Sequence, residues 1–313
     1  MRHRIELPAA LGQSFSVQDA AGHGIHRGRI DARDLARPFH GVRSTSTPDT
    51  FWALARSAAV RLRSEERFSG LTALRCWGLP TRRQWRPGEL LTVATPTGSG
   101  QSRAAGIRGV RLARERADTW SIHGVPVVDP IAALFSSAAL LDLLQAVIVI
   151  DALLSTASNY PGLHTGRPLF TASDIADKMA AWGPFAGCGT IREALTHARA
   201  RVESPKETET RMLITGAGLP EPVLQHEVRV DGRLIARTDL AYPELRIAIE
   251  YEGDGHRTDS RQWRLDIRRQ RELEGCGWTV IRLTQHDLGE GAASFLARLS
   301  DAIATRSQPH RAE

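Results

Sequence analysis

The chain has 313 residues, of which 42% are hydrophobic and 24% are charged. This length predicts more than one domain, and the absence of any run of 18 apolar residues argues against a membrane span. Residues 1–116 carry 20 arginines and 9 acidic residues, a net charge of +11, against −3 for residues 117–200 and −2 for residues 201–313. Such a basic first third indicates either a polyanionic partner such as DNA or an arginine-rich solvated surface.

The cysteine and lysine usage is sparse. The three cysteines are far apart and odd in number, which predicts reduced thiols and a cytoplasmic location: Cys76, Cys188 and Cys276. The first residues, Met1-Arg2-His3-Arg4, lack the apolar core of a signal peptide. Only Lys178 and Lys206 are lysines among 41 basic residues, which limits the choice of a catalytic lysine.

Residues 1–48 are predicted to form a helix-turn-helix or winged-helix-like DNA-binding region. Ser16 is placed to cap a first helix, with Asp19 as its capping partner, and Gly22-His23-Gly24 forms the turn after it. A basic second helix and a wing strand over residues 39–43 would follow. The residues expected to contact nucleic acid here are Arg27, Arg29, Arg33 and Arg43. An ordinary helical hairpin is the alternative.

Residues 49–200 are predicted to be a mixed α/β region that is mainly helical after residue 129. Helices are expected over residues 50–66, 68–80, 129–155 and 172–200, and strands within residues 89–125. The loop Gly98-Ser99-Gly100-Gln101 lacks the Gly-Lys-Ser/Thr ending of a phosphate-binding loop, so no nucleotide site is expected there.

Residues 203–313 are predicted to form a separate α/β unit. A helix begins after Ser204, with Glu207 at the capping-box position, and ends near Gly216. Strands follow at about 223–230, 233–241 and 246–252, then a helix at 259–275, a strand at 278–283 and a helix at 291–305. This order predicts a compact sheet flanked by helices.

The second and third of these strands carry paired carboxylates. Residues two apart on a strand share a face, so Glu250 and Glu252 point to the same side of the third strand. If the strands pair as a hairpin, Asp239 lies close to Glu250 on one surface. Packing does not need such a cluster, because like charges repel, and a divalent cation with oxygen ligands such as Mg²⁺ would relieve the repulsion.

The C-terminal third resembles a bacterial domain-of-unknown-function family related to the very-short-patch-repair endonucleases, within the PD-(D/E)XK nuclease superfamily. The order and spacing match over about 100 residues, in Ser204-Pro205-x-Glu207-Thr208-x-x-Arg211, Asp239-Leu240, Ile249-Glu250-Tyr251-Glu252-Gly253-Asp254-Gly255-His256, Asp266-x-x-Arg269-x-x-x-Leu273 and Gly277-Trp278-x-Val280-x-Arg282. The resemblance implies a restriction-endonuclease-like fold, with a mixed sheet flanked by helices. It also implies a Mg²⁺- or Mn²⁺-dependent nuclease.

The front two thirds of the chain resemble the segment that often precedes such domains in actinobacterial proteins. That segment begins with a winged-helix unit like the one in AbiEi-type antitoxins. The matching residues are Phe15-Ser16-Val17-x-x-Ala20, Arg37-Pro38-Phe39-x-Gly41-Val42-Arg43 and Leu71-Thr72-Ala73-Leu74-x-x-Trp77-Gly78-Leu79-Pro80. This resemblance implies DNA as a partner and leaves room for a cognate toxin-type protein.

At the matching positions, the nuclease resemblance implies that Asp239 is the metal-binding aspartate, Glu250 the acidic residue of the (D/E)-x-K element and Glu207 an auxiliary metal ligand. The chain departs from the pattern where Glu252 replaces the usual lysine. Four alternatives follow. In the first, Glu252 is a third metal ligand. In the second, an arginine such as Arg264 or Arg268 supplies the positive charge, and in the third, His256 takes the acid–base role. In the fourth, the nuclease fold is degenerate and serves binding.

Simpler structural roles also exist for several of these residues. Glu207 could be only a capping residue that pairs with Arg211, and Asp266 and Arg269 could be a structural pair on one helix. Trp278 is expected in the core. The two functions that the sequence supports are a metal-dependent DNA endonuclease or nickase and a DNA-binding antitoxin-type regulator with an inactive nuclease fold.

Overall fold

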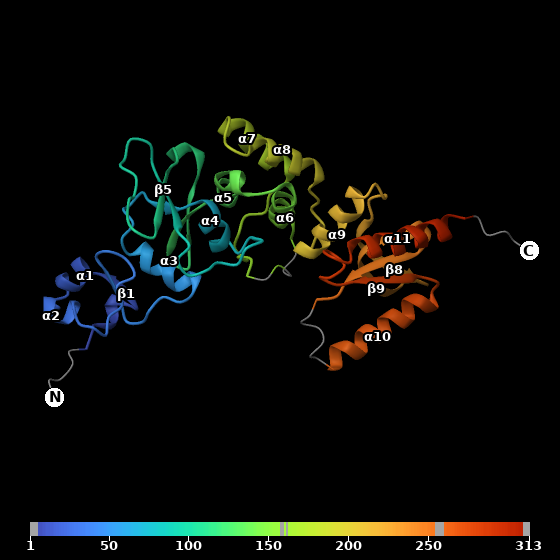
Figure 1. Cartoon of the computed structure of the whole chain (residues 1–313), viewed down its shortest axis with the longest axis horizontal. Helices are drawn as coiled ribbons and strands as arrows, with labels where there is room; N and C mark the ends of the chain where they lie inside the picture. The colour runs from blue at the N-terminus through green and yellow to red at the C-terminus, as the bar shows by residue number, and fades with distance from the viewer. Residues whose placement is uncertain (1–5, 157–159, 161, 254–259, 309–313) are drawn as a thin grey trace, which may run out of the picture. The chain divides into compact units, whose positions relative to one another are not determined.

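The computed structural model describes residues 6–156, 160, 162–253 and 260–308, the side chains of residues 260–266 excepted. The chain folds into two compact units, of which unit 1 comprises Met1–Val149 and Pro161–Leu195 and unit 2 comprises Ile150–Tyr160 and Thr196–Glu313 (Figure 1). The first 48 residues, expected as a region of their own, belong to unit 1. Among the described residues, no helix combines the length and apolar character that a bilayer span requires.

The N-terminal part of unit 1 is built on a two-stranded antiparallel sheet of β1 (Ser14–Ser16) and β2 (Val42–Ser44). Between them lie α1 (Val17–Gly22) and α2 (Arg27–Ile30), and η1 (Ala9–Leu11) precedes them. The Ser16 side chain accepts a hydrogen bond from the Asp19 backbone N–H at 2.9 Å, which is the predicted cap of α1. A small apolar core closes this part: Leu11, Phe15, Ala20, Ile30 and Leu35.

The predicted basic second helix is a single turn. The Arg43 side chain explains its end, because its Nε donates to the Ile30 carbonyl at 2.8 Å and its Nη2 donates to Asp31 at 2.7 Å. The carbonyl group of Ile30, at the C-terminus of α2, thus accepts a hydrogen bond from a side chain of β2. Arg33 therefore lies beyond the helix, in the loop that follows.

The rest of unit 1 contains a five-stranded mixed sheet in the order β5-β4-β3-β7-β6. Its strands are β3 (Arg67–Phe68), β4 (Leu91–Thr95), β5 (Ile107–Arg111), β6 (Thr119–Ile122) and β7 (Val125–Val128). The helices are α3 (Phe51–Ala59), α4 (Gly70–Cys76), η2 (Arg114–Arg116), α5 (Pro130–Ser137), η3 (Ala138–Leu140), α6 (Leu143–Leu154), α7 (Ala172–Trp182) and α8 (Cys188–His197), and α6 ends within unit 2. The predicted helix over residues 50–66 is shorter than expected, because α3 ends at Ala59 and turns and loop connect it to β3.

Unit 2 follows the predicted order of helix, three strands, helix, strand and helix. Its elements are α9 (Pro205–Gly216), β8 (Val223–Val230), β9 (Arg233–Tyr242), η4 (Pro243–Leu245), β10 (Ile247–Tyr251), α10 (Ser260–Gly275), β11 (Thr279–Leu283) and α11 (Ala292–Ser307). The sheet order is β11-β10-β9-β8, with β8–β9 and β9–β10 antiparallel and β10–β11 parallel. The chain is thus a mixed α and β protein with helices packed on mixed sheets.

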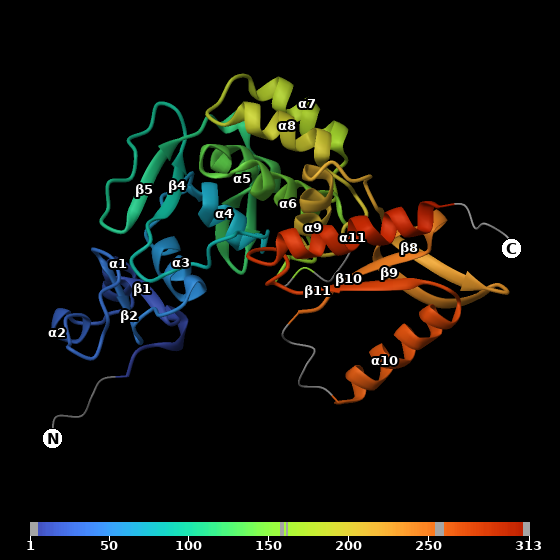
Figure 2. The same cartoon turned by 45° about the vertical axis from the view of Figure 1, so that its right-hand side comes forward.

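The sheet of unit 2 buries both of its faces. On one face, side chains such as Leu240 and Ile249 pack with Ile214 of α9 and Phe295 of α11. On the other face, small residues of the strands and Trp278 pack with Leu273 of α10. Helices α10 and α11 accordingly lie on opposite sides of the sheet (Figure 1 and Figure 2).

Candidate functional site

The register of β9 and β10 sets two carboxylates opposite each other. The strands pair antiparallel through Ile247 with Tyr242, Ala248 with Ala241 and Ile249 with Leu240. The next position along this register places Glu250 across from Asp239. Because side chains alternate between faces, both carboxylates lie on the face covered by α10. The Tyr251 backbone N–H donates to Asp239 Oδ2 at 3.1 Å, which fixes this side chain at the end of the strand pair.

Asp239 sits in an environment that disfavours its charge. Burial, together with the neighbouring charge of Glu250, raises the pKa of Asp239 to about 6, in spite of the lowering effects of the Tyr251 N–H and the Arg269 guanidinium. A cation placed between the two carboxylates would offset part of the cost of burying the Asp239 charge and part of its repulsion with Glu250.

Glu250 is held by an arginine from α10. Arg269 Nη2 lies 2.5 Å from Glu250 Oε1 and also donates to the Arg237 carbonyl at 3.0 Å. The guanidinium therefore joins the helix to both strands that carry the carboxylates. The interpretation of Arg269 as one half of a structural pair with Asp266 overlooked this contact, because the contact depends on the face that α10 turns toward the sheet.

Of the two arginines expected to supply a positive charge here, the structure describes the side chain of Arg268. Arg268 points away to the solvent and pairs with Glu272, one helical turn on, at 2.9 Å. The side chain of Arg264 and all of His256 lie outside the described residues. Among the described side chains of α10, the cation at the carboxylates is Arg269.

A third carboxyl group comes from the first turn of α9. Glu207 is only 4% exposed, and its Oε2 accepts hydrogen bonds from the Glu203 backbone N–H at 3.0 Å and Gln225 Nε2 at 2.8 Å. Burial raises the pKa of Glu207 to about 7, and the charge of Asp239 contributes to this rise. Glu207 therefore lies within electrostatic reach of Asp239.

The rest of the α9 motif anchors the fold. Arg211 does not pair with Glu207. It is buried, and its Nη2 contacts Asp151 at 3.0 Å while its Nη1 contacts Glu221 at 3.2 Å. The Thr208 hydroxyl also donates to Asp151, at 2.8 Å. Burial raises the pKa of Asp151 to about 6, in spite of the nearby arginine.

Glu252 lies apart from the carboxylate pair. Its side chain is exposed and forms an ion pair with Arg282 of β11. In this arrangement, the charge of Glu252 is neutralised by an arginine. The lysine of α9, Lys206, lies nearby, with its Nζ 6.0 Å from the centre of the Tyr251 ring and 2.7 Å from Glu209.

The donor set fits a hydrated Mg²⁺ better than a metal ion enclosed by protein. Within the described part of the chain, no three His, Cys, Asp or Glu side chains converge as a metal centre would require. Mg²⁺, however, is commonly held by one or two carboxylates together with water and substrate phosphates. Asp239 and Glu250 supply such a pair, and Glu207 lies close enough for the charge of Asp239 to raise its pKa.

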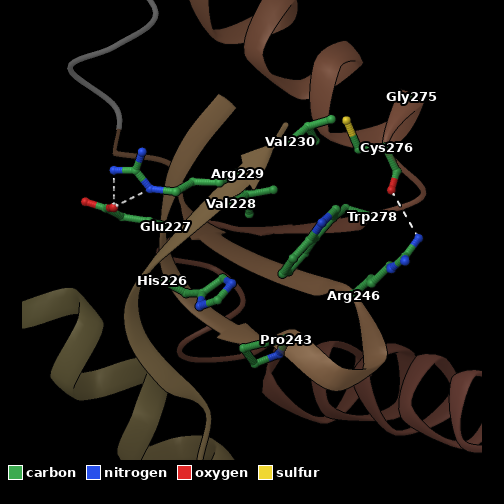
Figure 3. A pocket seen from close by; sticks show the side chains of 10 residues that line it. All are labelled: His226, Glu227, Val228, Arg229, Val230, Pro243, Arg246, Gly275, Cys276 and Trp278. Atoms are coloured by element: carbon green, nitrogen blue, oxygen red, sulfur yellow. Dashed lines mark hydrogen bonds and ion pairs between the residues drawn. The ribbon is translucent and has the colours of Figure 1, made fainter. Parts of the chain in front are cut away.

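A pocket of about 610 Å³ lies elsewhere on unit 2, between β8 and the turn that follows α10 (Figure 3). Trp278, which is buried as expected, packs against His226 in it, with 5.5 Å between the ring centres and an angle of 31° between the ring planes. Arg246 also lines the pocket, and its guanidinium group reaches toward the Cys276 carbonyl (Figure 3). The lining includes neither Asp239 nor Glu250, so the pocket and the carboxylate pair are separate features.

The predicted nucleic-acid contacts in the N-terminal part divide into two groups. Arg27 is 95% exposed, with one long ion pair to Asp31 at 3.5 Å, and Arg33 is also exposed. Both guanidinium groups are available to a polyanion.

Arg29 and Arg43 are not available in this way. Arg29 is buried and contacts Asp34 at 3.1 Å. Arg43 is buried against the end of α2, as described above. The expectation that these two arginines contact DNA is therefore corrected, because both guanidinium groups satisfy partners inside the fold.

Comparison with known proteins gives relatives without a described function. The chain is 30% identical over 128 residues to two proteins of Mycobacterium tuberculosis, the uncharacterized protein MT2308 of strain CDC 1551 / Oshkosh and the uncharacterized protein Rv2248 of strain ATCC 25618 / H37Rv. The match covers 41% of this chain and 47% of each relative, so the chain spans about half the length of the curated relatives it matches. No family model and no solved structure matches the chain.

Proposed function

We propose that the protein is a Mg²⁺-dependent phosphodiester hydrolase that cuts or nicks DNA in the cytoplasm, with Asp239 and Glu250 as the metal-binding pair. The observation that carries the proposal is the position of these two carboxylates across from each other on neighbouring strands. Their mutual repulsion contributes to the raised pKa of Asp239. Like charges placed side by side on neighbouring strands repel, whereas a divalent cation gains two ligands from them.

The surrounding residues have roles that follow from their contacts. When bound, Mg²⁺ would lower the pKa of a water molecule and stabilise negative charge on the phosphate. Arg269 orients Glu250 and keeps a positive charge at the site. Glu207, whose pKa burial and the charge of Asp239 raise to about 7, adds a third carboxyl group within electrostatic reach of the pair.

DNA is the substrate that the charge distribution favours. The net charge of +11 over residues 1–116 attracts a polyanion. Arg27 and Arg33 are exposed within this region, and their guanidinium groups suit phosphate oxygens.

The test is cleavage of supercoiled plasmid by the full-length protein with Mg²⁺ or Mn²⁺. We expect nicked or linear product from the wild type and loss of at least 100-fold in rate for Asp239→Asn, since the metal site loses one of its two charges. The matched control is Asp231→Asn, which removes an exposed carboxylate from the turn between β8 and β9. Equal cutting by wild type and Asp239→Asn would refute the proposal.

A second function, a DNA-binding antitoxin-type regulator with an inactive nuclease fold, is favoured by the contact of Glu252. This residue stands where the resembled superfamily has lysine, and it is neutralised by Arg282. For this function we expect salt-dependent DNA binding that is weakened by Arg27→Gln and Arg33→Gln, with no plasmid cleavage under any metal. A purified complex with a toxin-type protein would further support it.

A further inference from the structure

Seven aromatic rings form a continuous row in unit 1. Consecutive rings meet edge to face, with 4.9 to 6.4 Å between their centres. The row runs through Trp85, Phe51, Trp52, His123, His164, Trp77 and Trp120. These residues come from five separate segments, including the start of α3 and the turn between β6 and β7 (α3 is labelled in Figure 1).

Most of this aromatic row is not core. Trp77 is fully buried and donates from Nε1 to the Val128 carbonyl at 2.8 Å, so this ring is fixed in the core. In contrast, Trp120 is 38% exposed and His123 is exposed at a hairpin turn. Trp52 is only partly buried. In an edge-to-face pair only one ring uses its face, so the row retains ring faces that a further flat ring can cover.

The row is held by specific backbone geometry. His164 reaches Trp77 because its backbone N–H donates to the Trp77 carbonyl at 2.9 Å. This approach requires glycine at position 78, where φ is +66° and a Cβ atom would lie 1.8 Å from the Gly162 carbonyl oxygen. His123 itself adopts a φ of +48°, which is uncommon for a residue other than glycine. The ring positions are thus determined by the fold and do not result from surface side chains that move independently.

Positive charge lies at one end of the aromatic row. Trp85, the ring at that end, belongs to the segment Arg82-Arg83-Gln84-Trp85-Arg86. Arg82 pairs with Asp142 at 2.8 Å, whereas Arg83 and Arg86 are exposed and form no ion pair with any described residue. Trp85 Nε1 is buried without a hydrogen-bond partner in the described structure.

We propose that the aromatic row and the arginines of residues 82–86 bind single-stranded nucleic acid, with unpaired bases stacked on Trp120, His123 and Trp52 and phosphates bound by Arg83 and Arg86. Aromatic rings with cationic side chains beside them suit this ligand, because every base has a π-face and every linkage has a charge. A duplex is a poor fit, since its bases are already stacked on one another. This inference extends the proposed function by specifying a form of its substrate, but the binding itself needs no metal site.

The test is fluorescence anisotropy of labelled 20-nucleotide oligo(dT) and oligo(U) and of a duplex hairpin, with the full-length protein in EDTA. We expect one or both single strands to bind at least tenfold more tightly than the hairpin, and the tighter strand identifies the preferred sugar. Trp120→Ala should weaken this binding roughly 5- to 100-fold. Trp120→Phe, which keeps a ring at the same position, should restore most of the affinity.

The charge contribution has its own matched control. The double variant Arg83→Gln/Arg86→Gln should flatten the slope of log K against log salt by about 1.4, since each phosphate contact on a single strand contributes about 0.7. The control Arg103→Gln/Arg108→Gln removes two exposed arginines from another part of unit 1 and should leave the slope unchanged.

Equal slopes for the two double variants, preference for the hairpin, or wild-type affinity in Trp120→Ala would overturn the inference. Plasmid cleavage by the same Trp120→Ala protein separates the two proposals. Loss of single-strand binding with cleavage retained leaves both proposals standing, whereas cleavage without any single-strand binding by the wild type refutes the aromatic site alone.

Discussion

Replacing Glu207 by glutamine tests whether this carboxyl group is held in its neutral form by the fold. In the folded protein burial and Asp239 raise the pKa of Glu207 to about 7, from an ordinary value of 4.5. The raised pKa means that the folded state binds a proton that the unfolded state releases. This contribution to stability is fully present below pH 4.5 and is lost as the pH rises through 7.

The magnitude follows from the two pKa values. At about 1.4 kcal/mol per pKa unit, the difference between 4.5 and about 7 corresponds to about 3 kcal/mol, most of it lost between pH 5 and pH 8. Glutamine keeps an oxygen that can accept from Gln225 and from the Glu203 N–H, but it does not titrate. Between pH 5 and pH 8, we therefore expect the free energy of unfolding to fall by about 2 to 3 kcal/mol less in Glu207→Gln than in the wild type.

The measurement is urea unfolding at pH 5, 6, 7 and 8, followed by circular dichroism. Glu209→Gln is the matched control, because it removes a carboxylate from the same helix where that carboxylate pairs with Lys206 near the surface. This control should keep the pH dependence of the wild type. If Glu207→Gln keeps it as well, Glu207 is ionised in the folded protein and the account of the buried carboxyl is wrong.

Three further changes have definite outcomes. Arg211→Met should lower the free energy of unfolding by about 3–5 kcal/mol, because it leaves Asp151 buried without its cation, and the added change Asp151→Leu should recover much of this loss in urea titrations. Arg269→Gln should move the acidic limb of the pH–rate profile for plasmid cleavage to higher pH, since Arg269 lowers the pKa of Asp239, and an unmoved limb would contradict this role. Gly78→Ala should cost more than about 2 kcal/mol in the same unfolding assay, because left-handed strain adds to a backbone clash.

The part of the site that lies within a hairpin could be predicted from the sequence. The period of two along a strand and the short connection between β9 and β10 are enough to set Asp239 beside Glu250, and the observed register has this pairing. The order of elements in unit 2 was also predicted, because each element has its own local signals, such as the cap at Ser204.

Contacts between distant segments could not be predicted in this way. Arg269 reaches Glu250 only because α10 turns one particular face to the sheet, and the neighbouring Arg268 looks equivalent in the sequence. Likewise, composition does not distinguish the exposed Arg27 from Arg43, whose guanidinium caps a helix end. The aromatic row joins rings from five segments, so no local pattern signals it.

The most direct test of the central claim is calorimetric titration of the full-length protein with Mn²⁺. The wild type and the control Asp231→Asn should bind Mn²⁺ with the same affinity, and Asp239→Asn should show no saturable heat over the same range, because the carboxylate pair would be reduced to one charge. Saturable binding of equal strength by wild type and Asp239→Asn, or no binding by the wild type, would contradict a metal site at Asp239 and Glu250.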